Sequence, residues 1–395
     1  MYWRPLVSKF AGSVAVLLLV GTMALMGRAH PQDLEPAPTK DQPVLELDLR
    51  KVGYEPFTDS DIRWPTFVDF TDDNHLAIAW VTPDDPTAAR KTGVPAPQPA
   101  RLNVLILDAV SGEKKGQRAW PTPRFPVRFL GGRDGEFLTC TDNLLRLYSS
   151  TFEVIREQQL QDGRGCLSPL LWVTWGVSPS RRSLLLLSRA GQSFQNTLLN
   201  SETFTPIDNW TQKQTSIDIS DHWMVGQCDQ PVGICIRGVS QSWQPFKAVG
   251  LGGKLNRYTN KSPRFVNDRS LVIHADNEMA VVSIDGTVLF QRKLPEKQTF
   301  GTLVTSSGGE RFAIIENKLR GLTNEFLDMY PFPSNDRVVV YSILERRAIY
   351  VVKTNGTSPW SPWGPHVNQL ALSPDGTLLA LISDRVLKVY RLPKN

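Results

Sequence analysis

The segment Leu370-Ala-Leu-Ser-Pro-Asp-Gly-Thr-Leu-Leu-Ala-Leu-Ile382 gives the clearest indication of the fold of this chain. Two apolar runs flank a short segment that contains Pro374, Asp375 and Gly376, residues that are typical of tight turns. Strand, turn and strand in this order predict a β-hairpin. A third apolar segment, Leu387-Lys-Val-Tyr-Arg-Leu392, follows directly and predicts a third strand of the same sheet.

The same hairpin pattern occurs seven times along the chain. The copies lie at residues 67–80, 127–140, 175–187, 217–225, 264–273, 302–315 and 370–382. Most copies are separated by roughly 40 residues or more, the length of a four-stranded propeller blade. Further strand pairs can be read after several hairpins, and helical periodicity is missing outside the first 29 residues. The sequence therefore predicts an all-β, seven-bladed β-propeller.

The last repeat resembles the WD-repeat and related bacterial β-propeller families. The resemblance rests on residues 370–380 together with the strand that ends in Tyr390-Arg391-Leu392. No Trp-Asp dipeptide ends a third strand and no Gly-His pair opens a blade, so the chain resembles a divergent, WD40-like member. The resemblance implies the fold but no particular partner.

The two chain ends are expected to close the ring. The C-terminal repeat supplies only three strands, whereas residues 44–50 alternate as a strand and have no partner near them in sequence. Pairing these residues with the last blade completes it and removes an open sheet edge. We expect the closed ring to be a monomer.

The first 29 residues have the features of a signal peptide. Arg4 and Lys9 precede the apolar residues 10–26, and Gly27-Arg28-Ala29 offers a cleavage site after Ala29. The alternative is an uncleaved membrane anchor formed by residues 10–26. Residues 30–43 contain four Pro and predict an extended spacer, which places the propeller at residues 44–395. We expect an exported protein of the periplasm or the extracellular space, with membrane contact only through this segment.

Composition and charge exclude several classes of protein. The 395 residues are 41% hydrophobic and 21% charged, which is typical of a globular chain and argues against disorder. The net charge of +5 is spread over the sequence without a basic stripe, so nucleic acid is not an expected partner.

Four cysteines are compatible with disulfides in an exported protein. Cys228 and Cys235 bracket a short segment with Pro and Gly, and Cys140 and Cys166 form the remaining pair. The sequence allows three pairings, of which we expect Cys140–Cys166 and Cys228–Cys235. Neither spacing fits a zinc site.

Two insertions and a set of Trp-Pro segments indicate a binding face. Residues 82–100 and 316–337 both fall between the second and third strands of a blade, so they project from the same face, here called the top face. The connections between blades on that face are rich in Trp and Pro. The candidate partner-binding residues are Trp64, Trp120, Arg124, Trp175, Tyr330, Phe332, Trp360 and Trp363. Aromatic side chains of this kind stack on sugars or peptides, or they wedge between blades.

Motifs for catalysis, metals and cofactors are missing from the sequence. No GxSxG, HExxH or P-loop pattern occurs, and we expect no catalytic residues, metal or cofactor. Polar residues expected at the channel are Asp69, Arg128, Asp218 and Asn368. We therefore favour a non-enzymatic binding or scaffold module whose top face takes a protein, peptide or glycan. The alternative is a propeller hydrolase or lactonase with a small-molecule site in the channel.

Overall fold

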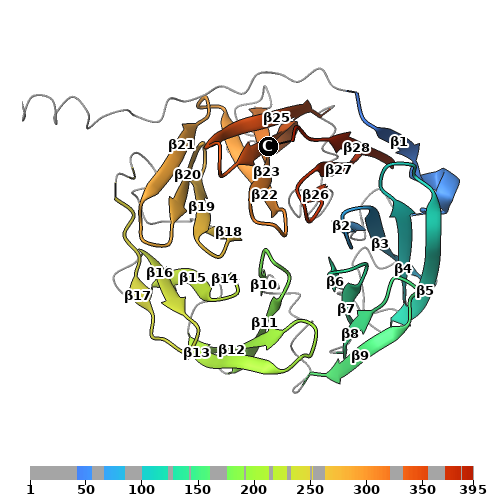
Figure 1. Ribbon diagram of the computed structural model, residues 1–395, viewed down its shortest axis with the longest axis horizontal. Coiled ribbons are helices and arrows are strands. Elements are labelled where there is room, and N and C mark those ends of the chain that lie inside the picture. Colours follow the sequence, from blue (N-terminus) through green and yellow to red (C-terminus); the bar gives the residue numbers. More distant parts are fainter. Residues whose placement is uncertain are drawn as a thin grey trace, which may run out of the picture. The chain divides into compact units, whose positions relative to one another are not determined.

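Seven four-stranded antiparallel sheets form a ring in the computed structural model (Figure 1). The chain divides into Met1–Leu34 and Glu35–Asn395, and all described residues belong to the second unit. The structure describes residues 42–55, 66–84, 100–122, 128–141, 144–160, 176–190, 193–212, 217–228, 233–249, 251, 263–320, 332–354, 370–383 and 385–394. The predicted signal peptide lies outside these residues, as does nearly all of the spacer.

Each blade uses four strands in chain order, except the seventh, which takes its outer strand from the N-terminal side. The first three blades are β2 (Thr66–Phe70), β3 (His75–Pro83), β4 (Ala100–Asp108), β5 (Lys114–Thr122); β6 (Arg128–Gly131), β7 (Phe137–Thr141), β8 (Leu144–Tyr148), β9 (Val154–Gln159); and β10 (Gly176–Val177), β11 (Ser183–Ala190), β12 (Ser193–Asn200), β13 (Pro206–Gln212). Blades four to six are β14 (Ile217–Ile219), β15 (Trp223–Cys228), β16 (Gly233–Gly238), β17 (Gln244–Pro245); β18 (Arg264–Asn267), β19 (Ser270–Ala275), β20 (Glu278–Ser283), β21 (Val288–Lys293); and β22 (Gln298–Thr305), β23 (Arg311–Arg320), β24 (Phe332–Ser342), β25 (Arg347–Lys353). Blade seven is β26 (Leu370–Leu372), β27 (Leu378–Ser383), β28 (Val386–Arg391) and β1 (Leu45–Asp48).

The N-terminal strand closes the ring, as the sequence predicts. β1 pairs antiparallel with β28, with Leu45 opposite Val389 and Asp48 opposite Val386. The chain then turns through the 3-10 helix η1 (Leu49–Val52) toward the first blade. Closure therefore joins the two ends of the chain within one sheet and leaves no gap between blades seven and one.

The turn between β26 and β27 is stabilised by hydrogen bonds of its own side chains. Asp375 accepts hydrogen bonds from the Ser373 hydroxyl at 2.6 Å and the Thr377 amide at 2.9 Å. Gly376 has a φ of +71°, a conformation that favours glycine. The apolar residues on both sides are buried, so the turn places one strand against the other with its apolar side chains in the core.

Apolar side chains fill the spaces between neighbouring blades. One cluster joins blades seven and one through residues such as Leu387, Val389, Leu76 and Ile78, all of which have no exposed surface. Similar clusters lie between the other blades. Burial of these residues is the main driving force for assembling the ring.

Polar links between blades lie at the ends of the first strands. They join each blade to its neighbour at all seven contacts, through a side chain that bonds the adjacent blade near the turn between the first and second strands. From the contact of blades seven and one onward, the pairs are Asp73–Asp375, Asp69–Gly131, Arg181–Gly132, Ser180–Asp221, Ser220–Asp268, Asn267–Gly309 and Arg311–Gly376. We call this side the bottom face.

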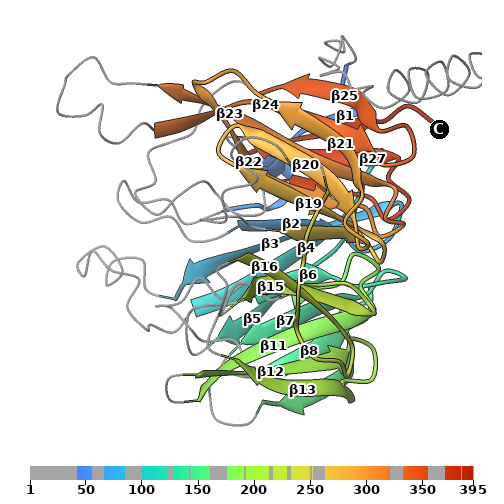
Figure 2. The same ribbon diagram turned by 90° about the vertical axis from the view of Figure 1, so that its left-hand side faces the viewer.

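Two hairpins extend toward the opposite, top face. β3 pairs with β4 as far as Pro83 and Ala100, and β23 pairs with β24 as far as Arg320 and Phe332. Figure 2 shows that both hairpins end on the same side of the ring. The predicted insertion 316–337 is therefore partly strand, because its first and last residues prolong β23 and β24.

Candidate functional site

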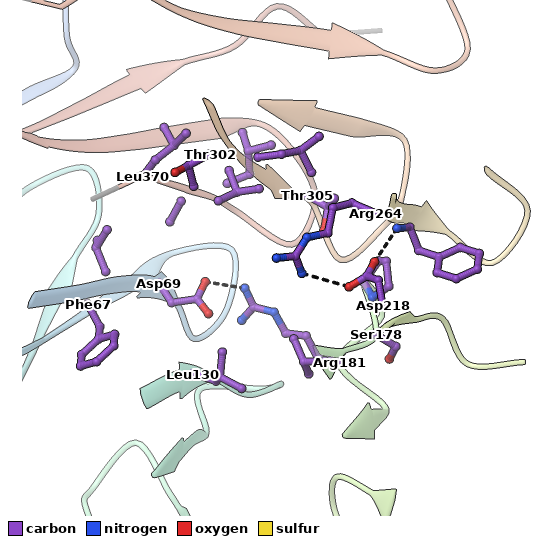
Figure 3. Close-up of a pocket in the computed structure, with 18 of the residues that line it drawn as sticks. Phe67, Asp69, Leu130, Ser178, Arg181, Asp218, Arg264, Thr302, Thr305 and Leu370 are labelled. Carbon is purple, nitrogen blue, oxygen red and sulfur yellow. Dashed lines mark hydrogen bonds and ion pairs between the residues drawn. The ribbon is translucent and has the colours of Figure 1, made fainter. Parts of the chain in front are cut away.

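The first strands of the blades surround the centre of the ring (Figure 1). They line a cavity of about 260 Å³, of which Figure 3 gives a close view. Its walls are supplied by β2, β6, β10, β14, β18, β22 and β26 and by the turn after β10. The charged residues of its lining are Asp69, Arg128, Arg181, Asp218 and Arg264. The wall formed by β22 and β26 is uncharged and consists of Thr, Leu, Val and Ala residues.

Asp69 and Arg181 form a buried ion pair between blades one and three. The Arg181 Nη2 atom lies 2.7 Å from Asp69 Oδ1, and the arginine side chain is only 8% exposed. The other Asp69 oxygen accepts the Gly131 amide of blade two at 2.8 Å. Arg181 Nη1 donates to the carbonyls of Phe70 and Gly132. One aspartate and one arginine thus connect three consecutive blades.

Asp218 and Arg264 repeat part of this arrangement between blades four and five. Arg264 Nη1 donates to Asp218 Oδ1 at 3.1 Å, and the Phe265 amide donates to Asp218 Oδ2 at 2.6 Å. The Arg264 side chain is 37% exposed, whereas that of Asp218 is 9% exposed. Figure 3 shows the Arg264 guanidinium over the cavity, on the side of Asp218.

Burial changes the proton affinity of these groups. It raises the pKa of Asp69 and of Asp218 above the usual value, and the arginine and amide donors partly oppose this effect. Next to Arg264, burial and the arginine charge lower the pKa of His274 to about 4. His274 is therefore neutral at neutral pH, and both aspartates already hold fixed hydrogen-bond partners.

Arg128 is the charged channel residue that differs from the others. It starts β6, and burial lowers the pKa of its guanidinium. No hydrogen bond or ion pair joins its guanidinium to another residue in the described part of the chain. The two other arginines of the lining each hold an aspartate, so Arg128 contributes an uncompensated positive charge.

The structure brings together three of the four polar residues that the sequence places at the channel. Asp69, Arg128 and Asp218 line the cavity, and Asn368 lies outside the described residues. Sequence reasoning missed Arg181 and Arg264. Arg264 opens a repeated hairpin and could have been found from its position, but Arg181 lies in a turn, which gives no sign that it reaches the channel.

Among the predicted top-face residues, Trp120 is placed at the contact between blades one and two. Its ring centroid lies 4.9 Å from that of Tyr148 and 5.9 Å from that of Phe152, and Arg118 lies over the ring. These contacts describe a wedge between blades. Phe332 begins β24, and its backbone pairs with Arg320. The predicted residues outside the described ranges are Trp64, Arg124, Trp175, Tyr330, Trp360 and Trp363.

A disulfide joins Cys228 and Cys235 across the end of the β15–β16 hairpin, with 5.1 Å between their Cα atoms. It lies at the top end of blade four. Cys140 is fully buried in β7, and its expected partner Cys166 lies outside the described residues.

Two further observations concern metal sites and membrane-spanning helices. Within the described ranges, no three His, Cys, Asp or Glu side chains come together as a metal site would require. No helix in the same part of the chain has the length and apolar character needed to cross a membrane.

Comparisons with known proteins identify structural neighbours with low sequence identity. No protein-family model matches the chain, and no curated protein matches it either. A chain in a crystal structure of the mitotic checkpoint complex is similar at 13% identity and a TM-score of 0.47, over 93% of this chain and 99% of that one. The C-terminal WD40 domain of Sif2 is similar at 11% identity and a TM-score of 0.44, over 87% of this chain and all of that domain. The chain is a seven-bladed propeller with WD40 structures among its neighbours, and this likeness concerns the fold alone.

Proposed function

We propose that this protein is an exported, non-enzymatic binding or scaffold module whose top face takes a protein, peptide or glycan partner. The observation that carries the proposal is the position of the two insertions. Their paired ends, in the long hairpins β3–β4 and β23–β24, lie on the same face of the ring. Connecting segments held by a rigid scaffold are the usual place for binding residues.

The arrangement of the bottom face supports this assignment. Its polar groups near the first turns are engaged in bonds between blades at all seven contacts. These bonds between blades stabilise the ring that carries the insertions. The Cys228–Cys235 disulfide is compatible with the proposed export, because disulfides persist in oxidising compartments.

The alternative, a hydrolase or lactonase in the channel, needs a carboxylate or imidazole free to accept a proton. Asp69 and Asp218 each hold an arginine and a backbone amide instead. The cavity lining contains no histidine or glutamate among the described residues. We therefore favour a binding function over hydrolysis for this protein.

Differential capture from a cell-envelope extract tests the proposal. In two variants, residues 85–99 or 321–331 are replaced by a short Gly-containing turn, which retains the paired ends at Pro83–Ala100 and Arg320–Phe332. The control is Leu344→Ala, because Leu344 is 66% exposed in the turn between β24 and β25 at the opposite face.

We expect at least one replacement to lose a partner that the wild-type chain and Leu344→Ala retain, with unchanged unfolding temperatures. A further variant combines Trp64→Ala with Trp363→Ala. It omits Trp120, whose packing between blades would make a loss of binding ambiguous. Equal capture by all variants would contradict binding through the top face.

A further inference from the structure

Arg128 presents a positive charge that the described protein groups do not neutralise. Arg128 lines the channel cavity, and neither a carboxylate nor a carbonyl among the described residues bonds its guanidinium. A guanidinium stays protonated in proteins and carries five donors. Placing such a group in a partly buried site is unfavourable unless an acceptor approaches it from the cavity.

The charge balance of the lining indicates the charge of that acceptor. Arg181 holds Asp69, and Arg264 holds Asp218, so these four residues sum to zero. Arg128 leaves a net charge of +1 in the lining. A monoanion matches this charge, whereas a neutral molecule leaves it uncompensated and a dianion exceeds it.

The opposite side of the cavity is uncharged and largely apolar. Figure 3 shows Thr302 and Leu370 on the side of the cavity opposite the two Asp–Arg pairs. Leu303, Val304 and Ala371 complete this wall, together with hydroxyl groups of the neighbouring threonines. The volume of about 260 Å³ is below the range usual for drug-sized ligands, so the occupant is small.

We propose that the central channel binds a small monocarboxylate, with its carboxylate on the Arg128 guanidinium and its short apolar body against the wall of β22 and β26. The planar fork of an arginine matches the two oxygens of a carboxylate in a bidentate contact. This site is separate from the insertions of the top face, and either proposal can fail without the other.

Butyrate titration of the full chain is the direct test. The Nε–Hε signal of Arg128 is followed by NMR, with its assignment taken from the spectrum of Arg128→Met, and unfolding temperature is measured in parallel. We expect a saturable shift of that signal and a rise in unfolding temperature with butyrate. In Arg128→Met the apparent affinity, measured from the unfolding temperature as a function of butyrate concentration, falls by about tenfold or more, because a charge-assisted bidentate contact is lost.

Three controls distinguish the carboxylate site from other effects. Arg156→Met removes the same charge from an exposed position on β9 and retains butyrate binding. Butyramide, which has the same shape without the charge, gives no saturable shift. Inorganic phosphate tests a multiply charged oxyanion, and we expect weaker binding than for butyrate.

The proposal is overturned if butyrate raises the unfolding temperature of Arg128→Met as much as that of the wild-type chain. It is also overturned if butyrate produces no saturable shift of the Arg128 signal in the wild-type chain, an outcome that does not depend on the stability of any variant. Tighter binding of phosphate than of butyrate would reject the monocarboxylate assignment.

Discussion

The two Asp–Arg pairs of the channel share one hydrogen-bond arrangement at the aspartate but differ in the burial of the arginine. In both pairs, an aspartate of a first strand accepts the amide of the next blade, Gly131 in one case and Phe265 in the other. The difference lies in the arginine. Arg181 is 8% exposed and bonds two blades, whereas Arg264 is 37% exposed and bonds one residue of the neighbouring blade.

The Asp69–Arg181 pair is therefore mainly structural, whereas the Asp218–Arg264 pair remains accessible from the cavity. The first pair connects three blades and buries its cation, so its loss leaves several acceptors without a donor. The second pair keeps one face of its guanidinium toward the cavity, where water or a ligand can replace lost contacts. Two Asp–Arg pairs that line the same channel are therefore expected to contribute different amounts to the free energy of unfolding.

The largest effect is expected from Arg181→Met. The substitution leaves the Asp69 carboxylate and the carbonyls of Phe70 and Gly132 without this donor. Removal of one partner of a buried ion pair costs about 3 to 5 kcal/mol of unfolding free energy. Urea unfolding at neutral pH measures the change. The control is Arg182→Met, since Arg182 is exposed in the same turn, and its expected effect is within about 0.5 kcal/mol. Equal unfolding midpoints for the two variants would contradict the structural role of Arg181.

A second prediction concerns pH and the blade that carries Arg264. The folded protein holds the pKa of His274 at about 4, below the ordinary value of 6.5, so the unfolded chain binds this proton first as the pH falls. The contribution of neutral His274 to the free energy of unfolding is fully present above pH 6.5. It decreases as the pH falls, by about 3 kcal/mol at pH 4.

The comparison of wild type with His274→Asn isolates this contribution. The raised pKa values of Asp69 and Asp218 act in the opposite direction, because a folded state that holds protons more tightly gains stability as the pH falls. These aspartates are present in both proteins, so their contribution cancels in the difference. We expect the wild type to lose more unfolding free energy than the variant between pH 6.5 and 4. Parallel stability curves would contradict the low pKa of His274.

The smallest effect is expected from Arg264→Met. Asp218 keeps the Phe265 amide, and the exposed position of the guanidinium allows water to take its place. We expect a loss of about 1 kcal/mol, because partly exposed ion pairs contribute little. The arginine charge also lowers the pKa of His274, so an NMR titration should show a higher His274 pKa in Arg264→Met than in Arg181→Met. A loss of stability as large as that of Arg181→Met would remove the distinction between the pairs.

The repeated hairpins and the strand near Leu45 were predictable because their patterns are local. An apolar segment, a turn with Asp375 and Gly376, and a second apolar segment define a hairpin without reference to the rest of the chain. The position of Asp69 and Asp218 in first strands also made them channel candidates. The partners of these aspartates were not predictable, because Arg181 lies 112 residues from Asp69 and comes from a turn.

Seven apolar hairpins, a closing N-terminal strand and a pair of insertions could be read from the sequence, because period and turn chemistry act over a few residues. Which charges meet in the channel depends on the folded ring, which brings Asp69 and Arg181 within 2.7 Å. The folded ring also places Arg128 in the lining of the cavity, where its guanidinium has no partner among the described residues. The physical reason is that a side chain of a first strand takes its neighbours from other blades, and those neighbours are set by the geometry of the whole ring.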